Sequence, residues 1–115
     1  MTTIDTNGNI THIKGDTFAL TFTSVKQDGV TINWTGYTMK FTAKEYPGAT
    51  PIISLTQTSG INLSTNGQIS IRESASTMAG ITPKNYVYDL EVTDASGNVD
   101  TWFNNKNLTV LQDIA

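Results

Sequence analysis

The sequence predicts an all-β fold, an Ig-like β-sandwich with Greek-key-like connections and one short helical turn. Three observations carry this prediction. Apolar and polar side chains alternate along several segments, dipeptides of the Asn-Gly type separate those segments, and threonine is abundant. The branched Cβ of threonine favours the extended backbone of a strand. About nine short strands of this kind are typical of a sandwich or a Greek-key-like barrel.

The clearest strand signal lies in residues 84–103. Every second side chain from Tyr86 to Val92 is apolar, so these side chains share one face of an extended chain. The intervening residues are mostly polar, which indicates one face on a core and one face in water. The segment Asp94–Gly97 has turn chemistry, and the alternation resumes from Val99 to Phe103. This stretch therefore predicts a β-hairpin.

Weaker signals complete the predicted domain. Residues 1–13 are interpreted as either an N-terminal arm or a small hairpin around Asn7-Gly8. Residues 74–80 combine a serine N-cap, small residues and a glycine stop, which predicts a single helical turn. Further strands are predicted at 17–25, 37–46, 52–55, 61–63, 68–73 and 106–111, and further turns at Asp28-Gly29 and Asn66-Gly67.

Length and composition limit the classes of function. The 115 residues predict one domain, 1–115, without a linker or an internal repeat. The chain contains no cysteine, which excludes disulfides and thiolate metal sites. The net charge is −3 and no basic run occurs, so we expect no nucleic-acid partner. Because no apolar leader or membrane-length apolar run is visible, we also expect a soluble protein with no membrane contact.

The sequence offers only weak candidates for a catalytic or metal-binding site. Asp89 and Glu91 lie two residues apart, but no third ligand accompanies them, and a solvated strand face is the better interpretation. The segment Asp94–Asn98 lacks the ladder of carboxylates of a calcium loop and is better interpreted as a turn. His12 is the only histidine. We therefore expect no enzyme activity, no cofactor and no metal.

Aromatic residues are the best candidates for a binding or interface site. Trp102 is out of phase with Val99 and Phe103, so the alternation predicts that it points outward. Trp34 and Tyr46 are the further candidates. Exposed aromatic side chains anchor protein interfaces or stack on sugars. The residues alone leave both uses open.

Several segments together resemble a small β domain of tailed-bacteriophage virion proteins, best represented by the N-terminal domain of baseplate upper proteins. The resemblance covers the chain from about Lys14 onward. The sequence departs from it at two places: Asn33-Trp34 replaces an expected Asp-Leu, and Asn85 replaces a usual glycine. The segments that carry it are Gly15–Leu20, Asp28-Gly29, Thr35–Tyr37, Tyr86–Val92 with Asp94 and Gly97, and Leu108–Leu111.

The resemblance implies a non-catalytic virion structural protein of the tail, baseplate or neck, or one associated with the capsid. Such a protein is made in the host cytoplasm, resides in the virion and docks onto other virion proteins. It also implies a homo-oligomer, because phage structural parts assemble as rings or trimers. The alternative is a carbohydrate-binding or adhesin-type module, in which Trp34, Tyr46 and Trp102 form a stacking platform.

Overall fold

The computed structural model describes residues 2–22, 26–27, 29–31, 33–57, 59–64 and 67–112. Its strands and its one helix follow one another along the chain. They are β1 (Thr2–Ile4), β2 (Ile10–Ile13), β3 (Phe18–Phe22), β4 (Lys26–Gln27), β5 (Val30–Thr31), β6 (Thr38–Lys44), β7 (Pro51–Gln57), β8 (Gly60–Leu63), β9 (Ile69–Glu73), α1 (Ala75–Met78), β10 (Asn85–Thr93) and β11 (Val99–Leu111).

Nine of these described strands form one mixed sheet in the order β1-β2-β11-β10-β6-β7-β8-β9-β3, while β4 and β5 form a small separate hairpin. Most neighbours are antiparallel. The two parallel pairs are β2 with β11 and β7 with β8. The all-β prediction is therefore confirmed, whereas the Ig-like sandwich is not confirmed by this arrangement.

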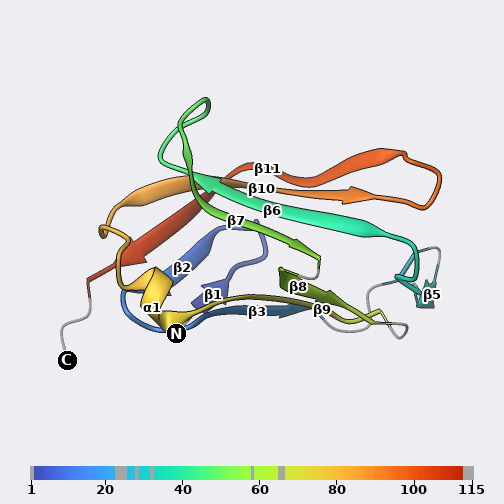
Figure 1. Cartoon of the computed structure of the whole chain (residues 1–115), viewed down its shortest axis with the longest axis horizontal. Helices are drawn as coiled ribbons and strands as arrows, with labels where there is room; N and C mark the ends of the chain where they lie inside the picture. The colour runs from blue at the N-terminus through green and yellow to red at the C-terminus, as the bar shows by residue number, and fades with distance from the viewer. Residues whose placement is uncertain are drawn as a thin grey trace.

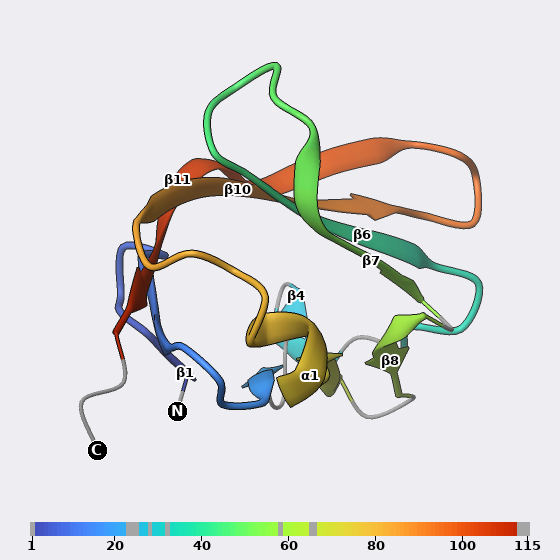
Figure 2. The same cartoon turned by 60° about the vertical axis from the view of Figure 1, so that its left-hand side comes forward.

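The sheet curls into two layers around one core. In Figure 1, β7, β6, β10 and the first part of β11 lie above β8, β9, β3, β1 and β2, and Figure 2 shows the same layers from the side. On the return strand, the alternation predicted from Val99 to Phe103 is not confirmed, since Val99 and Thr101 are exposed and Phe103 is only partly buried. The alternation predicted along 37–46 and 84–93 is confirmed, because every second side chain of β6 and β10 is buried. These core side chains are Met39, Phe41, Ala43, Tyr86, Tyr88, Leu90 and Val92.

The two end strands of the sheet, β1 and β3, meet through a side chain. The backbone N–H of Ala19 in β3 donates to the hydroxyl of Thr2 in β1, at 3.1 Å. This hydroxyl also lies 2.8 Å from Nδ1 of His12, which is fully buried on the neighbouring strand β2. Residues 2–13 are thus a small hairpin, one of the two predicted forms, and that hairpin brings the ends of the sheet together.

Strand β11 is longer than predicted. Residues 106–111 were expected to form a separate closing strand, but the strand runs unbroken from Val99 to Leu111. It contains a bulge, because Asn104 and Asn105 together face Asp89 across the ladder. The bulge shifts the alternation by one residue, which makes one strand look like two in the sequence.

The remaining predictions have mixed outcomes. Helix α1 is the predicted helical turn, with the Ser74 hydroxyl accepting from the backbone N–H of Thr77. The segments 18–22, 51–57, 60–63 and 69–73 are strands as predicted. Residues 23–25, Asp28 and Asn66 lie outside the described residues. Among the described residues, no helix is long and apolar enough to cross a membrane.

Candidate functional site

Trp102 lies at a second irregularity of the β10–β11 ladder. Leu90 pairs with Phe103 and the next residue, Glu91, pairs with Thr101, so Trp102 has no partner across the ladder. A bulge of this kind changes the direction in which its extra residue points. The Trp102 side chain is 36 % exposed. The prediction that it points outward is thus right in part, since one side of the ring lies against the protein.

Trp102 is the outer member of a row of three aromatic rings. Its ring centroid is 5.4 Å from that of Trp34, and the planes are tilted by 58°. Trp34 in turn meets Tyr37 edge-on, with a centroid distance of 5.0 Å. Aromatic pairs prefer such tilted and edge-to-face contacts. The row connects a solvent-exposed ring to the core, so the position of Trp102 depends on that of Trp34.

Trp34 is held by the turn that precedes β6. The Asn33 side chain accepts hydrogen bonds from the backbone and the hydroxyl of Thr35, at 3.0 and 2.7 Å. Gly36 has a φ of +86°, which a glycine adopts without strain. The backbone N–H of Trp34 donates to the carbonyl of Ser64 at 3.3 Å. These contacts direct the Trp34 side chain inward.

The carbohydrate alternative expected Trp34 to belong to an exposed platform, and this expectation is wrong. The Trp34 side chain is only 2 % exposed. Tyr46 is 60 % exposed, in the loop between β6 and β7, and it makes no ring contact with either tryptophan in the described part of the chain. The structure thus brings Trp34 and Trp102 together and leaves Tyr46 apart.

Asp89 has a structural role that the sequence analysis missed. Its carboxylate accepts the backbone N–H of Asn105 at 2.7 Å, inside the bulge of β11. Asn105 has a φ of +55°, a conformation that asparagine tolerates better than most residues. Beside it lies an open hollow of about 430 Å³ under the loop between β6 and β7. The Asp89 carboxylate thus holds the backbone of the β11 bulge. Glu91, two residues further along β10, is half-buried.

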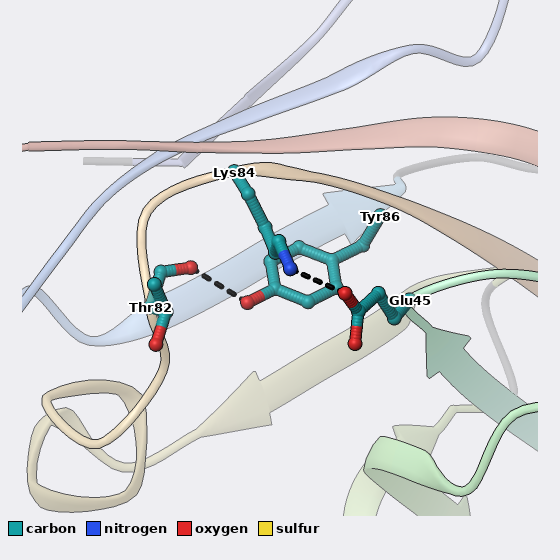
Figure 3. A network of polar contacts seen from close by, with 4 residues as sticks. All are labelled: Glu45, Thr82, Lys84 and Tyr86. Atoms are coloured by element: carbon teal, nitrogen blue, oxygen red, sulfur yellow. Dashed lines mark hydrogen bonds and ion pairs between the residues drawn. The ribbon is translucent and has the colours of Figure 1, made fainter.

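A polar network joins the same loop to the start of β10 (Figure 3). The Lys84 ammonium forms an ion pair with the Glu45 carboxylate, and this hydrogen bond raises the pKa of Lys84. The Tyr86 hydroxyl donates to the carbonyl of Thr82 at 2.6 Å. Burial raises the pKa of Tyr86. Because Lys84 and Glu45 are both largely exposed, this pair orders the surface and adds little stability.

His12 is a neutral structural residue. Its Nε2 lies 3.1 Å from the carbonyl oxygen of Asp16, which can only accept a hydrogen bond. Nε2 therefore carries the hydrogen, and Nδ1 accepts from the Thr2 hydroxyl. Burial lowers the pKa of His12. Both ring nitrogens are occupied by these contacts.

The segment Asp94–Asn98 is a turn, as predicted. The Asp94 carboxylate accepts the backbone N–H groups of Ser96 and Asn98, both at 2.9 Å. These bonds, that of Asn98 first, lower the pKa of Asp94. The carboxylate binds its own loop. The described residues contain no cluster of three or more histidine and carboxylate side chains placed to hold a metal ion.

Comparisons with known proteins do not extend this description. A scan against models of protein families finds no matching family, and a search of curated proteins finds no matching relative. The described strands and the surroundings of Trp102 define a class only, a small all-β domain with a curled mixed sheet.

Proposed function

We propose that this protein is a non-catalytic virion structural subunit that docks onto other subunits through the outer half of the β10–β11 hairpin. The observation that carries the proposal is Trp102, a large ring that remains 36 % exposed on a strand bulge. Partly exposed tryptophan side chains often contribute strongly to protein interfaces. The resemblance of the sequence to phage virion domains supplies the biological setting.

The neighbourhood of Trp102 supports this proposal. Val99, three residues earlier on the same strand, is 61 % exposed. The adjoining residues Asp100, Thr101 and Asn104 are exposed as well. The outer half of the hairpin thus exposes two apolar side chains among polar ones: Val99 lies across the ladder from Thr93, and Trp102 packs on Trp34. We take a second copy of the chain as its first partner.

Light scattering during size-exclusion chromatography tests this docking. Over a wide range of concentration we expect a trimer or a larger ring, and we expect Val99→Asp to shift the equilibrium toward monomer. A charge at Val99 would have to be desolvated in the interface. The matched control is Val30→Asp, because Val30 is 69 % exposed on the β4–β5 hairpin.

Two results would contradict the proposal. One is a strict monomer at the highest concentration that also fails to bind any purified virion protein encoded by neighbouring genes. The other is an oligomer that dissociates equally with Val30→Asp and Val99→Asp, since that would assign the interface to no particular hairpin.

The Ig-like, Greek-key-like description of the fold is part of the same proposal. Its support is the two-layer packing in Figure 1, with β6 and β10 above β3 and β9. The parallel pairs β2–β11 and β7–β8 connect the layers into one sheet. An experimental structure compared with known sandwiches would test this description, and a closed barrel with no sandwich relative would contradict it.

The carbohydrate-binding alternative is not supported as a stacking platform of Trp34, Tyr46 and Trp102. A stacking platform needs exposed rings side by side, whereas Trp34 is buried and Tyr46 lies on a separate loop.

A further inference from the structure

The first part of strand β11 is an open edge of the sheet. On one side, residues 99–107 lie against β10, and in Figure 1 they run above it on the outer side of the hairpin. On the other side, β2 pairs only with residues 108–111. Within the described part of the chain, no strand pairs with residues 99–107 on that second side. An open edge presents unpaired backbone N–H and C=O groups, to which a further strand can add.

The irregularities of this edge are symmetric about Phe103. Asp100, Phe103 and Lys106 each lie opposite a buried residue of β10. Two residues separate Asp100 from Phe103, and two separate Phe103 from Lys106, whereas a single residue of β10 faces each of these intervals. One extra residue therefore lies on each side of Phe103, at the same distance along the strand.

This spacing suits a second copy better than an unrelated strand. Bulges interrupt a ladder with a regular partner, and natural proteins use them to protect strand edges. A second copy that runs antiparallel, with Phe103 opposite Phe103, brings its own two-residue intervals opposite those of the first copy. The two strands then have equal numbers of residues between their paired positions, so the ladder continues through the irregular part.

The charges on this edge are self-complementary in the same register. With Phe103 opposite Phe103, Asp100 of each copy lies opposite Lys106 of the other. Both residues face buried side chains of β10, so they lie on one face of the sheet, as directly opposed residues do. Neither of them forms an ion pair with another described residue. Opposite charges across an antiparallel ladder are stabilising, and the two-fold symmetry provides two such pairs.

The same register covers the exposed part of the Trp102 surface. Residues 101–102 of one copy lie opposite residues 104–105 of the other. Val99, which is 61 % exposed, lies opposite the exposed Asn107 on the outer face of the sheet. The paired edge thus includes the two apolar side chains that the hairpin exposes.

We propose that two copies of this chain pair edge to edge through residues 99–107 of β11, antiparallel about a two-fold axis at Phe103. The inference rests on the proposed docking function, because it states how a second copy lies on the same hairpin. A two-fold contact joins copies in pairs. The assembly should therefore contain an even number of copies, which excludes the trimer and retains the even-numbered rings.

Disulfide formation tests the register directly, because the full chain contains no cysteine. Directly opposed residues have Cα atoms about 4.5–5.5 Å apart, a distance that a disulfide spans. The double variant Val99→Cys with Asn107→Cys should therefore form, on mild oxidation, a dimer linked by two disulfides between positions 99 and 107. Within one chain these positions are roughly 20 Å or more apart along the strand. Non-reducing electrophoresis and peptide mapping by mass spectrometry identify the linked positions.

The matched control for this experiment is Val99→Cys alone. The two-fold axis places position 99 of the two copies at opposite ends of the paired edge, so this variant should form no specific dimer. A disulfide that joins position 99 to position 99 would indicate a different orientation of the two strands.

Charge reversal tests the two ion pairs. Asp100→Lys places like charges opposite each other at both ends of the edge and should raise the dissociation constant by about tenfold or more, as measured by light scattering. Lys106→Asp should do the same. An equimolar mixture of these two variants restores both opposite pairs and should associate as the wild type does. Arg72→Asp is the matched control, because Arg72 is exposed on β9 and its charge changes by the same amount.

Three outcomes would overturn this inference and leave the docking proposal in place. The first is an oligomer that dissociates with Val99→Asp but forms no disulfide between positions 99 and 107. The second is a mixture of the two charge variants that associates no better than each variant alone. The third is an odd number of copies. A strict monomer would overturn the inference as well, and the docking proposal would then depend on binding to other virion proteins.

Discussion

Two turns of this molecule have the same local structure and very different surroundings. The loop 5–9 joins β1 to β2, and the loop 94–98 joins β10 to β11. Both follow the pattern Asp-x-x-Gly-Asn. In each turn, the aspartate carboxylate accepts hydrogen bonds from the backbone N–H groups two and four residues later, all at 2.9 Å. The backbone N–H of the glycine donates to the backbone carbonyl of the aspartate.

The surroundings differ at the glycine. Gly8 is buried, its carbonyl accepts a hydrogen bond from the Tyr88 hydroxyl, and a Cβ placed there would lie 2.9 Å from the ring of Phe103. Gly97 is exposed, and its Cβ position has nothing within 4 Å. The same five-residue turn is therefore part of the packed interior in one hairpin and a solvated loop in the other. Packing, more than turn chemistry, should decide how much each turn contributes to stability.

The largest difference is expected between Gly8→Ala and Gly97→Ala. Both glycines have a positive φ, +87° and +89°, so both substitutions introduce backbone strain of about 1 kcal/mol or more. Only Gly8→Ala adds a clash with Phe103, worth a further 1–3 kcal/mol, roughly. Urea unfolding of both variants measures the difference, and equal losses would show that the interior contact does not matter.

Removal of the Tyr88 hydroxyl should have the next largest effect. Tyr88→Phe leaves the carbonyl of Gly8 without its donor in a buried position, which should lower the free energy of unfolding by about 1–3 kcal/mol. Tyr37→Phe is a control, since the Tyr37 hydroxyl makes no hydrogen bond within the described residues. A Tyr88→Phe variant as stable as its control would contradict the interior role of the first turn.

The first hairpin should also make stability depend on pH, through His12. Its pKa is lowered in the folded protein, so the unfolded chain binds a proton more readily. The free energy of unfolding should therefore be highest above pH 6.5, the ordinary pKa of histidine, and should decrease as the pH falls below that value. Thermal unfolding between pH 7.5 and about 5 measures this dependence. His12→Gln should flatten the curve in that range, and an unchanged curve would assign the dependence to other groups.

The smallest difference in stability is expected between substitutions of the two aspartates, Asp5 and Asp94. In both turns, hydrogen bonds from the backbone, with Asn9 or Asn98 first, hold the carboxyl pKa below its ordinary 3.8. Asp5→Ala and Asp94→Ala should each lower the melting temperature slightly and by similar amounts. Their contribution should be present above about pH 4 and disappear as the pH falls through the lowered pKa. A much larger loss for Asp5→Ala would mean that the two turns already differ at the aspartate.

Much of the local structure was predictable from the sequence, because alternation is a local property. The strands around Tyr88 and Phe41 and the turn at Gly97 follow from a few consecutive residues each. The repeated Asp-x-x-Gly-Asn pattern was visible too, but we predicted no internal repeat. A five-residue match is too short to stand out in a chain rich in asparagine and threonine.

The rest depended on contacts between distant residues. No local pattern shows that Asn105 needs the Asp89 carboxylate, so the bulge made β11 look like two strands. The turn at Gly36 directs Trp34 inward, and the sequence alone could not distinguish that from an exposed ring. The bond between Ala19 and Thr2 joins the two ends of the sheet, and it exists only once the sheet has curled.

The order of the strands has a consequence for folding during synthesis. Strand β2 pairs with β1 on one side and with residues 108–111 of β11 on the other. Strand β3 pairs with residues 69–73 of β9. A ribosome would therefore release the apolar segment Phe18–Phe22 long before its partner strand, and Ile10–Ile13 would wait longer still. Such non-local pairing slows folding and leaves strand edges available to other chains. The nascent protein should need a chaperone, or fast synthesis, more than its small size suggests.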